Sequence, residues 1–174
     1  TVEIAVPIEK ADAGIIITAS HNPREWNALK LLNNKGEFIN AEDGKNLMSI
    51  ADSNPSIDEN INLGSVTFND SYIDSHIDLI LKLPFIDSES IKRRKLKVVV
   101  DAVNSTGGIA IPKLLDRLGV ETINLYCDPT GEFPHNPEPL KENLSDLSNL
   151  VVNEAADLGI VVDPDVDRLA FVSE

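Results

Sequence analysis

The sequence is poor in cysteine. Its 174 residues include one, Cys127, so no internal disulfide can form. A single thiol also removes the paired cysteine spacings that are typical of zinc sites. A lone cysteine fits a reducing compartment, and we therefore expect the protein to be cytoplasmic.

Positive charge is also scarce. Lysine and arginine total 15 against 29 aspartates and glutamates, which gives a formal net charge of −14. Such a balance repels nucleic acid and anionic lipid, so we expect neither as a partner. No apolar run approaches the roughly 18 residues that a membrane span needs. The 42% of hydrophobic residues suffice for a buried core, and any phosphate ligand has to be held locally.

The most distinctive motif is an acidic loop between two apolar runs, Asp163-Pro164-Asp165-Val166-Asp167-Arg168. Three carboxylates at two-residue spacing repel one another, and a cation makes the arrangement favourable. Oxygen ligands without nearby histidine or cysteine indicate a hard ion such as Mg²⁺. A solvated acidic turn is the plainer alternative. A calcium-binding EF-hand is disfavoured, because its sixth position needs glycine but holds Arg168, although Glu174 falls at the twelfth.

The second half of the chain shows alternating strand and helix patterns. We expect strands at 96–100, 120–126 and 159–162, with amphipathic helices between them at 111–118 and 144–155. This order implies a parallel, doubly wound sheet, in which ligands bind at the carboxyl ends of the strands. The glycine turn (residues 104–108) and the acidic loop (residues 163–168) both lie there. The glycine turn lacks a full dinucleotide fingerprint, so a tight turn that needs glycine fits it better than a phosphate cradle.

The first half is less regular. Gly14 to Thr18 reads as a buried parallel strand. The segment 2–8 alternates as a strand does, but Pro7 argues against a central strand, and we leave it open. Two helices are expected, the first capped by Asn40 and the second by Asp70. Their apolar positions, expected to contact the core, are Leu47, Met48 and Ala51 in the first and Tyr72, Ile73, His76, Ile77, Ile80 and Leu81 in the second, with His76 as a packed structural histidine.

A boundary is expected between Pro84 and Lys97. It contains the basic cluster 92–95, which we interpret as a solvated linker. The chain is therefore predicted to hold two α/β domains with doubly wound, mainly parallel sheets, at residues 1–90 and 91–174, the first of them incomplete.

Ser20 follows the strand at 14–18, in the polar serine loop (residues 19–23). A hydrolase elbow requires Gly-x-Ser-x-Gly, and the neighbours here are Ala19 and His21. Adjacent serine and histidine side chains usually diverge, so a direct activation pair is disfavoured. A phosphorylated Ser20 could instead complete the coordination of a cation held by the acidic loop.

Four segments in this order resemble the α-D-phosphohexomutase superfamily, which includes phosphoglucomutase, phosphomannomutase and phosphoglucosamine mutase. They are Thr18-Ala19-Ser20-His21-Asn22-Pro23, Asn27-Ala28-Leu29-Lys30, Phe133-Pro134-His135-Asn136-Pro137-Glu138-Pro139 and the acidic loop. Pro164 and Val166 replace glycines that are usual in that loop, and Ala28 replaces another glycine. These departures spare the functional side chains but obscure the substrate branch.

The resemblance implies that Ser20 is the phosphoserine, and that Asp163, Asp165 and Asp167 bind Mg²⁺ together with its phosphate. It also implies that Lys30 is the acid/base residue and that His21 and Arg168 steady phosphate groups. The substrate would be a hexose phosphate and the activator a hexose 1,6-bisphosphate.

Family members have four domains, so the resemblance implies a fragment that covers the latter part of the first domain and most of the second. The alternative from another class is a non-catalytic divalent-cation-binding module that uses the same three aspartates.

Overall fold

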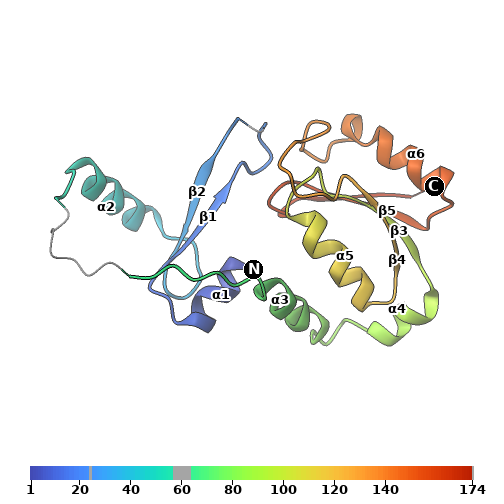
Figure 1. The fold of residues 1–174 in the computed structure, drawn as a ribbon, viewed down its shortest axis with the longest axis horizontal. Helices are drawn as coiled ribbons and strands as arrows, with labels where there is room; N and C mark the ends of the chain where they lie inside the picture. The colour runs from blue at the N-terminus through green and yellow to red at the C-terminus, as the bar shows by residue number, and fades with distance from the viewer. Residues whose placement is uncertain (24, 57–63, 174) are drawn as a thin grey trace. The chain divides into compact units, whose positions relative to one another are not determined.

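The computed structural model describes residues 1–23, 25–56 and 64–173. The chain divides into two compact units, Thr1–Ile16 with Lys30–His76, and Ile17–Leu29 with Ile77–Glu174. Helices and strands alternate in the chain (Figure 1), which confirms the predicted α/β class. Residue 24, the segment 57–63 and Glu174 lie outside the described residues. No helix in the described ranges is both long and apolar enough to cross a membrane.

The second unit is built on a four-stranded sheet of order β4-β3-β5-β6. β3 pairs in parallel with both β4 and β5, and β6 is antiparallel to β5. The valines of β3 are buried, as expected for a strand covered on both faces. The strands are β3 (Lys97–Asp101), β4 (Glu121–Leu125), β5 (Leu158–Val162) and β6 (Leu169–Val172).

Helices α5 (Gly107–Arg117) and α6 (Ser145–Asn153) cover opposite faces of this sheet (Figure 1). Val98 and Val100 pack with Leu115 of α5, whereas Val99 packs with Leu147 of α6. Because side chains alternate across a strand, these contacts belong to the two faces. The predicted doubly wound arrangement is therefore confirmed for this unit.

The basic cluster 92–95 closes helix α4 (Ser88–Arg94) instead of forming a linker. The helix begins at Asp87, whose side chain accepts the N–H of Ser90 at 2.9 Å. Cations in the last turn interact favourably with the helix dipole. The cluster is exposed to solvent as expected, but the linker interpretation is wrong because its first three residues form the last turn of the helix and Lys95 caps it.

The first unit contains α1 (Val2–Glu9), α2 (Ala41–Asp52) and the first half of α3 (Tyr72–Leu81). Strands β1 (Gly14–Thr18) and β2 (Ala28–Leu32) form a two-stranded sheet. The segment left open at 2–8 is a helix that contains Pro7, and its one buried residue is Val6. Asn40 caps α2 as predicted, since its side chain accepts the N–H of Asp43 at 2.9 Å.

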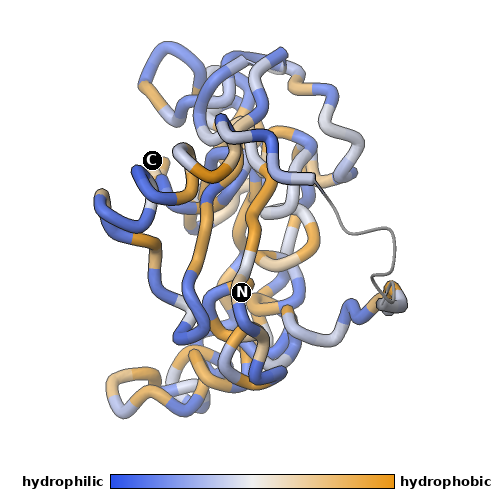
Figure 2. Tube along the Cα trace, turned by 90° about the vertical axis from the view of Figure 1, so that its left-hand side faces the viewer, coloured by the Kyte–Doolittle hydropathy of each residue, from blue (hydrophilic) through white to orange (hydrophobic). Residues whose placement is uncertain are grey.

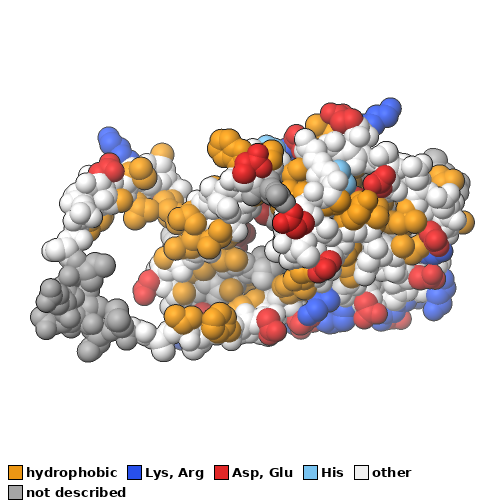
Figure 3. Space-filling model, turned by 45° about the horizontal axis from the view of Figure 1, so that its top comes forward, with side chains coloured by type: hydrophobic (Ala, Val, Ile, Leu, Met, Phe, Trp, Pro, Cys, Tyr) orange, Lys and Arg blue, Asp and Glu red, His pale blue; other side chains and the backbone are white. Residues whose placement is uncertain are grey.

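The expected burial is wrong at several apolar positions of β1 and α2. Ile15 and Ile17 of β1 are 58% and 73% exposed, and Met48 of α2 is 62% exposed. Figure 2 shows hydrophobic and hydrophilic segments alternating along the chain, and Figure 3 shows hydrophobic side chains at the surface. His76 is half-buried, lies 3.1 Å from Thr1 Oγ1, and has a pKa lowered mainly by desolvation, as suits a packed histidine.

Candidate metal and phosphoryl-transfer site

The acidic loop is a tight turn between β5 and β6. Asp163 is fully buried, and its Oδ1 accepts the backbone N–H groups of Asp167 and Arg168, both at 3.1 Å. Val166 has φ 63°, in the left-handed region that favours glycine. The geometry therefore explains why glycine is usual here, and a β-branched residue adds strain of about 1 kcal/mol or more.

The three aspartates converge as the sequence predicts. One carboxylate oxygen from each of Asp163, Asp165 and Asp167 lies within 4.8 Å of the others. Oδ2 of Asp163 is buried and has no hydrogen-bond partner among the described residues. A buried carboxylate oxygen without a donor is costly, and a hard cation with oxygen ligands would satisfy it. The residues present therefore fit a metal ion.

Electrostatics agree with this fit. The pKa of Asp163 is raised to about 6, first by burial and then by the carboxylates of Asp165 and Asp167, while N–H bonds from Arg168 and Asp167 act against the shift. A group with this raised pKa binds its proton more tightly in the folded than in the unfolded chain. The free energy of unfolding is then largest at acidic pH and falls as the pH rises through about 6.

We expect Asp163→Asn to remove this pH dependence. In the presence of EDTA it should stabilise the chain above about pH 6, by up to about 3 kcal/mol for a shift of about two pKa units. Asparagine keeps an oxygen for the two N–H donors, so the turn should survive. Urea unfolding of both proteins from about pH 4 to about pH 7 measures the difference. Parallel pH profiles for the two proteins would contradict the expectation.

The serine loop is tied to the acidic loop through Thr18. The hydroxyl of the buried Thr18 donates a hydrogen bond to Asp165 Oδ2 at 3.0 Å. The same hydroxyl accepts a hydrogen bond from the backbone N–H of Ser20 at 2.7 Å. Ser20 has φ 52°, an uncommon conformation for a non-glycine residue that often marks a functional turn. Its Oγ lies 3.3 Å from His21 Nδ1, so the expectation that these side chains diverge is wrong.

Thr18 was not predicted as a site residue. The signals for it in the sequence are its place at the end of β1, two residues before Ser20, and its position as the first residue of the family-like segment 18–23. Lys30 is half-buried on β2 and belongs to the first unit. Its acid/base role stays a prediction.

The glycine turn supports the acidic loop from the neighbouring strand end. Ser105 Oγ and Thr106 Oγ1 both donate to the carbonyl of Pro164 at 2.8 Å. A Cβ on Gly108 would lie 2.2 Å from the carbonyl oxygen of Cys127. Only glycine, which has no Cβ, avoids this clash. These contacts favour the interpretation of a tight turn that needs glycine over a phosphate cradle.

Comparisons with known proteins point to one family. Residues 1–58 match the model of phosphoglucomutase/phosphomannomutase alpha/beta/alpha domain I, and residues 70–174 match that of domain II. A probable phosphoglucosamine mutase of Methanopyrus kandleri is 37% identical over 97% of this chain and 36% of its own length. A phosphoglucomutase/phosphomannomutase of Thermococcus kodakarensis is 36% identical, over 94% of this chain and 36% of its own length.

Solved structures show the same fold. A phosphoglucomutase/phosphomannomutase family protein from Burkholderia thailandensis has a TM-score of 0.72 and 31% identity, over 94% of this chain and 34% of its own. The chain belongs to the phosphoglucomutase/phosphomannomutase family, whose domain I and domain II models it matches in order. It spans a little over a third of the length of these curated relatives.

Proposed function

We propose that this chain supplies the phosphoserine and the metal loop of a hexose-phosphate mutase. The observation that carries the proposal is the link from Thr18 to Asp165, at 3.0 Å, which ties the serine loop to the three carboxylates. A module that only bound a cation would not need this link. The names of the relatives support the reaction class, since they include phosphoglucosamine mutase and phosphoglucomutase/phosphomannomutase.

In the proposed reaction, phosphoserine Ser20 donates its phosphoryl group to a hydroxyl of a hexose monophosphate. The bond from phosphorus to Ser20 Oγ breaks, a bond to the sugar oxygen forms, and Lys30 takes the hydroxyl proton. The resulting bisphosphate turns over in the site. Its other phosphoryl group then returns to Ser20, and Lys30 gives its proton to the sugar oxygen that is left.

The remaining residues hold phosphate and charge. Asp163, Asp165 and Asp167 would bind the metal, which we propose to be Mg²⁺ because all the donors are carboxylate oxygens. When bound, Mg²⁺ would offset negative charge on the transferring phosphoryl group. His21, with Nδ1 3.3 Å from Ser20 Oγ, and Arg168 would steady phosphate oxygens. A hexose 1,6-bisphosphate would restore the phosphoserine.

Several expectations stay proposals. We propose a hexose phosphate as the substrate. The sequence does not decide among glucose, mannose and glucosamine phosphates, which differ at the 2-position of the sugar. The division at residues 1–90 and 91–174 and the cytoplasmic location also remain predictions.

The experiment is a coupled mutase assay on a protein of the relatives' full length that contains this chain, beside the 174-residue chain alone. We expect the long protein to interconvert hexose 1- and 6-phosphates with Mg²⁺ and a hexose 1,6-bisphosphate. The 174-residue chain should turn over at least roughly 100-fold more slowly, because binding energy from remote parts of a substrate supports the chemical step.

Two outcomes would contradict the proposal in different ways. A long protein that interconverts none of the glucose, mannose and glucosamine phosphates would remove the mutase function. Turnover by the 174-residue chain at a rate near that of the long protein would show that its own residues hold the whole substrate.

A further inference from the structure

The proline loop (residues 133–139) takes no part in the proposed chemistry. The residues just before it are nevertheless hydrogen-bonded to Asn104, which follows β3. Asn104, in the left-handed conformation with φ 54°, donates its side-chain N–H to the carbonyl of Glu132 at 3.0 Å. The backbone carbonyl of Asn104 accepts the N–H of Gly131 at 2.9 Å. Two hydrogen bonds from one residue therefore fix the start of the loop.

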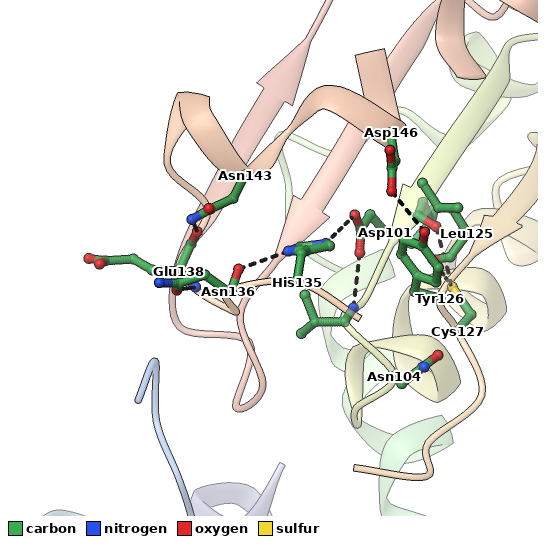
Figure 4. A network of polar contacts seen from close by, with 12 residues as sticks. Asp101, Asn104, Leu125, Tyr126, Cys127, His135, Asn136, Glu138, Asn143 and Asp146 are labelled. Carbon is green, nitrogen blue, oxygen red and sulfur yellow. Dashed lines mark hydrogen bonds and ion pairs between the residues drawn. The ribbon is translucent and has the colours of Figure 1, made fainter. Parts of the chain in front are cut away.

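The middle of the loop is fixed by a buried carboxylate. Asp101 is the last residue of β3 and is fully buried, with Oδ1 accepting the N–H of Val103 at 3.0 Å. Its Oδ2 lies 2.9 Å from His135 Nε2, and His135 Nδ1 lies 2.8 Å from the carbonyl oxygen of Asn136 (Figure 4). Both ring nitrogens thus face oxygen acceptors, which is the environment of a doubly protonated imidazole.

The pKa of His135 follows this geometry. The hydrogen bond that the ring donates to the Asp101 carboxylate raises it most, burial acts against that rise, and the bond to the Asn136 carbonyl raises it again. The rings of Tyr126 and His135 pack in a T-shaped arrangement with their centroids 5.8 Å apart, and Asp146 accepts a hydrogen bond from the Tyr126 hydroxyl. A charged imidazole beside a buried carboxylate forms an ion pair. Removing either partner is costly, because it leaves the other charge buried without a counter-charge.

The end of the loop reaches the acidic loop. Glu138 Oε1 lies 2.5 Å from Arg168 Nη1, with both side chains about one-third exposed. The Glu138 backbone is held on both sides, since its N–H donates to Asn136 Oδ1 at 3.1 Å and its carbonyl accepts from Asn143 Nδ2 at 2.8 Å. The main chain of Arg168 is already fixed to Asp163. Glu138 therefore sets where the guanidinium lies.

We propose that the proline loop positions Arg168, with the pair of Asp101 and His135 anchoring the loop and Glu138 holding the guanidinium. Glu138 and His135 are then positioning residues that act through Arg168. The inference rests on the proposed function only for the kinetic effect, since the contacts themselves are a property of this chain. The loop also borders an open pocket of about 240 Å³ that reaches Pro23 of the serine loop.

The kinetic test uses Glu138→Gln in the full-length mutase. We expect kcat to fall about tenfold with a smaller change in KM, because a misplaced phosphate-holding group costs mainly the chemical step. In an Arg168→Gln background the same change should cost less than about twofold, since residues that act through each other are not additive. Glu142→Gln removes the same charge from a neighbouring exposed residue and serves as the control.

Additive losses in the double variant would overturn the proposal, as would a rise in kcat for Glu138→Gln, which would mean that Glu138 restrains Arg168 instead of placing it. If the wild-type long protein has no mutase activity, the proposed function fails and a second measurement decides the inference.

The second measurement is NMR of the 174-residue chain. The imidazole of His135 should titrate above its usual value of about 6.5, and Asp101→Asn should bring it down. The charged or titratable groups facing His135 are Asp101, Tyr126, Asp146 and, across the pocket, Glu25. The guanidinium signal of Arg168 should shift in Glu138→Gln and not in Glu142→Gln. A His135 that titrates at its ordinary value, or an unmoved Arg168 signal, would overturn the proposal.

Discussion

In a protein of the relatives' full length that contains this chain, Ser20→Ala is expected to abolish phosphoryl labelling by a hexose 1,6-bisphosphate and to reduce turnover on the order of 1000-fold or more. The hydroxyl of Ser20 would be the atom that carries the phosphoryl group, and removing a nucleophile costs most of the catalysis that depends on it. The change should leave the loop in place, because the Ser20 N–H, and not its hydroxyl, bonds to Thr18. Phosphopeptide mapping after treatment with labelled bisphosphate locates the phosphoryl group.

Ser173→Ala is the matched control, since Ser173 is exposed and takes no part in the proposed site. It should keep both labelling and turnover. Label found on Ser105 or Ser173 in the wild-type protein would move the phosphoryl carrier elsewhere and remove the mechanism as written.

The fold of the second unit could be predicted from the sequence because its pattern is unambiguous. Val98 to Val100 form a continuous apolar run rich in β-branched residues, which is typical of a strand covered on both faces. The helices that cover it carry apolar residues at helical spacing and end at clear signals such as Gly119, which has φ 66°. Local preference and tertiary packing agree there.

The first unit shows where that agreement ends. Residues 2–8 alternate as a strand does, yet they form α1, whose buried Val6 would meet any side chain placed on Gly14 at 2.6 Å. The packing of Val6 against Gly14 therefore belongs to the helix, and tertiary contacts of this kind override the strand-like alternation of residues 2–8. In α2 the pattern correctly predicts a helix and its cap, but an apolar face does not say what covers it, and Met48 is exposed.

The candidate site also has a part that the sequence predicts and a part that it does not. The three aspartates fall within one six-residue loop, so their spacing alone predicts that they converge. The partners that hold this loop come from distant positions. Thr18 lies 147 residues before Asp165, and Glu138 lies 30 residues before Arg168. Such pairs meet only through the tertiary fold, because Thr18 ends a strand of the two-stranded sheet and Glu138 lies in the loop between β4 and α6. No local pattern encodes which side chains touch.

In the same long protein, Asp165→Asn should reduce the proposed mutase turnover at least roughly 100-fold, because even outer-shell partners of a metal are typically worth about 10–100-fold. One anionic donor would be lost from a set of three that lies within 4.8 Å. Asparagine keeps an oxygen that can accept the Thr18 hydroxyl, so the link to the serine loop should remain and the fold should be intact. Activity measured against Mg²⁺ concentration, with circular dichroism of the same samples, separates lost metal binding from lost structure.

Asp128→Asn removes the same charge from an exposed residue and should leave the Mg²⁺ dependence unchanged. Calorimetric titration of Mg²⁺ into the 174-residue chain adds a readout that needs no activity, and Asp165→Asn should weaken that binding while Asp128→Asn should not. If Asp165→Asn kept both wild-type turnover and wild-type Mg²⁺ dependence, the three carboxylates would be no more than a buried acidic turn. A proton, and not a metal, would then neutralise the buried carboxylate of Asp163, whose pKa is raised. Thr18 would hold the serine loop and the acidic loop together for stability alone.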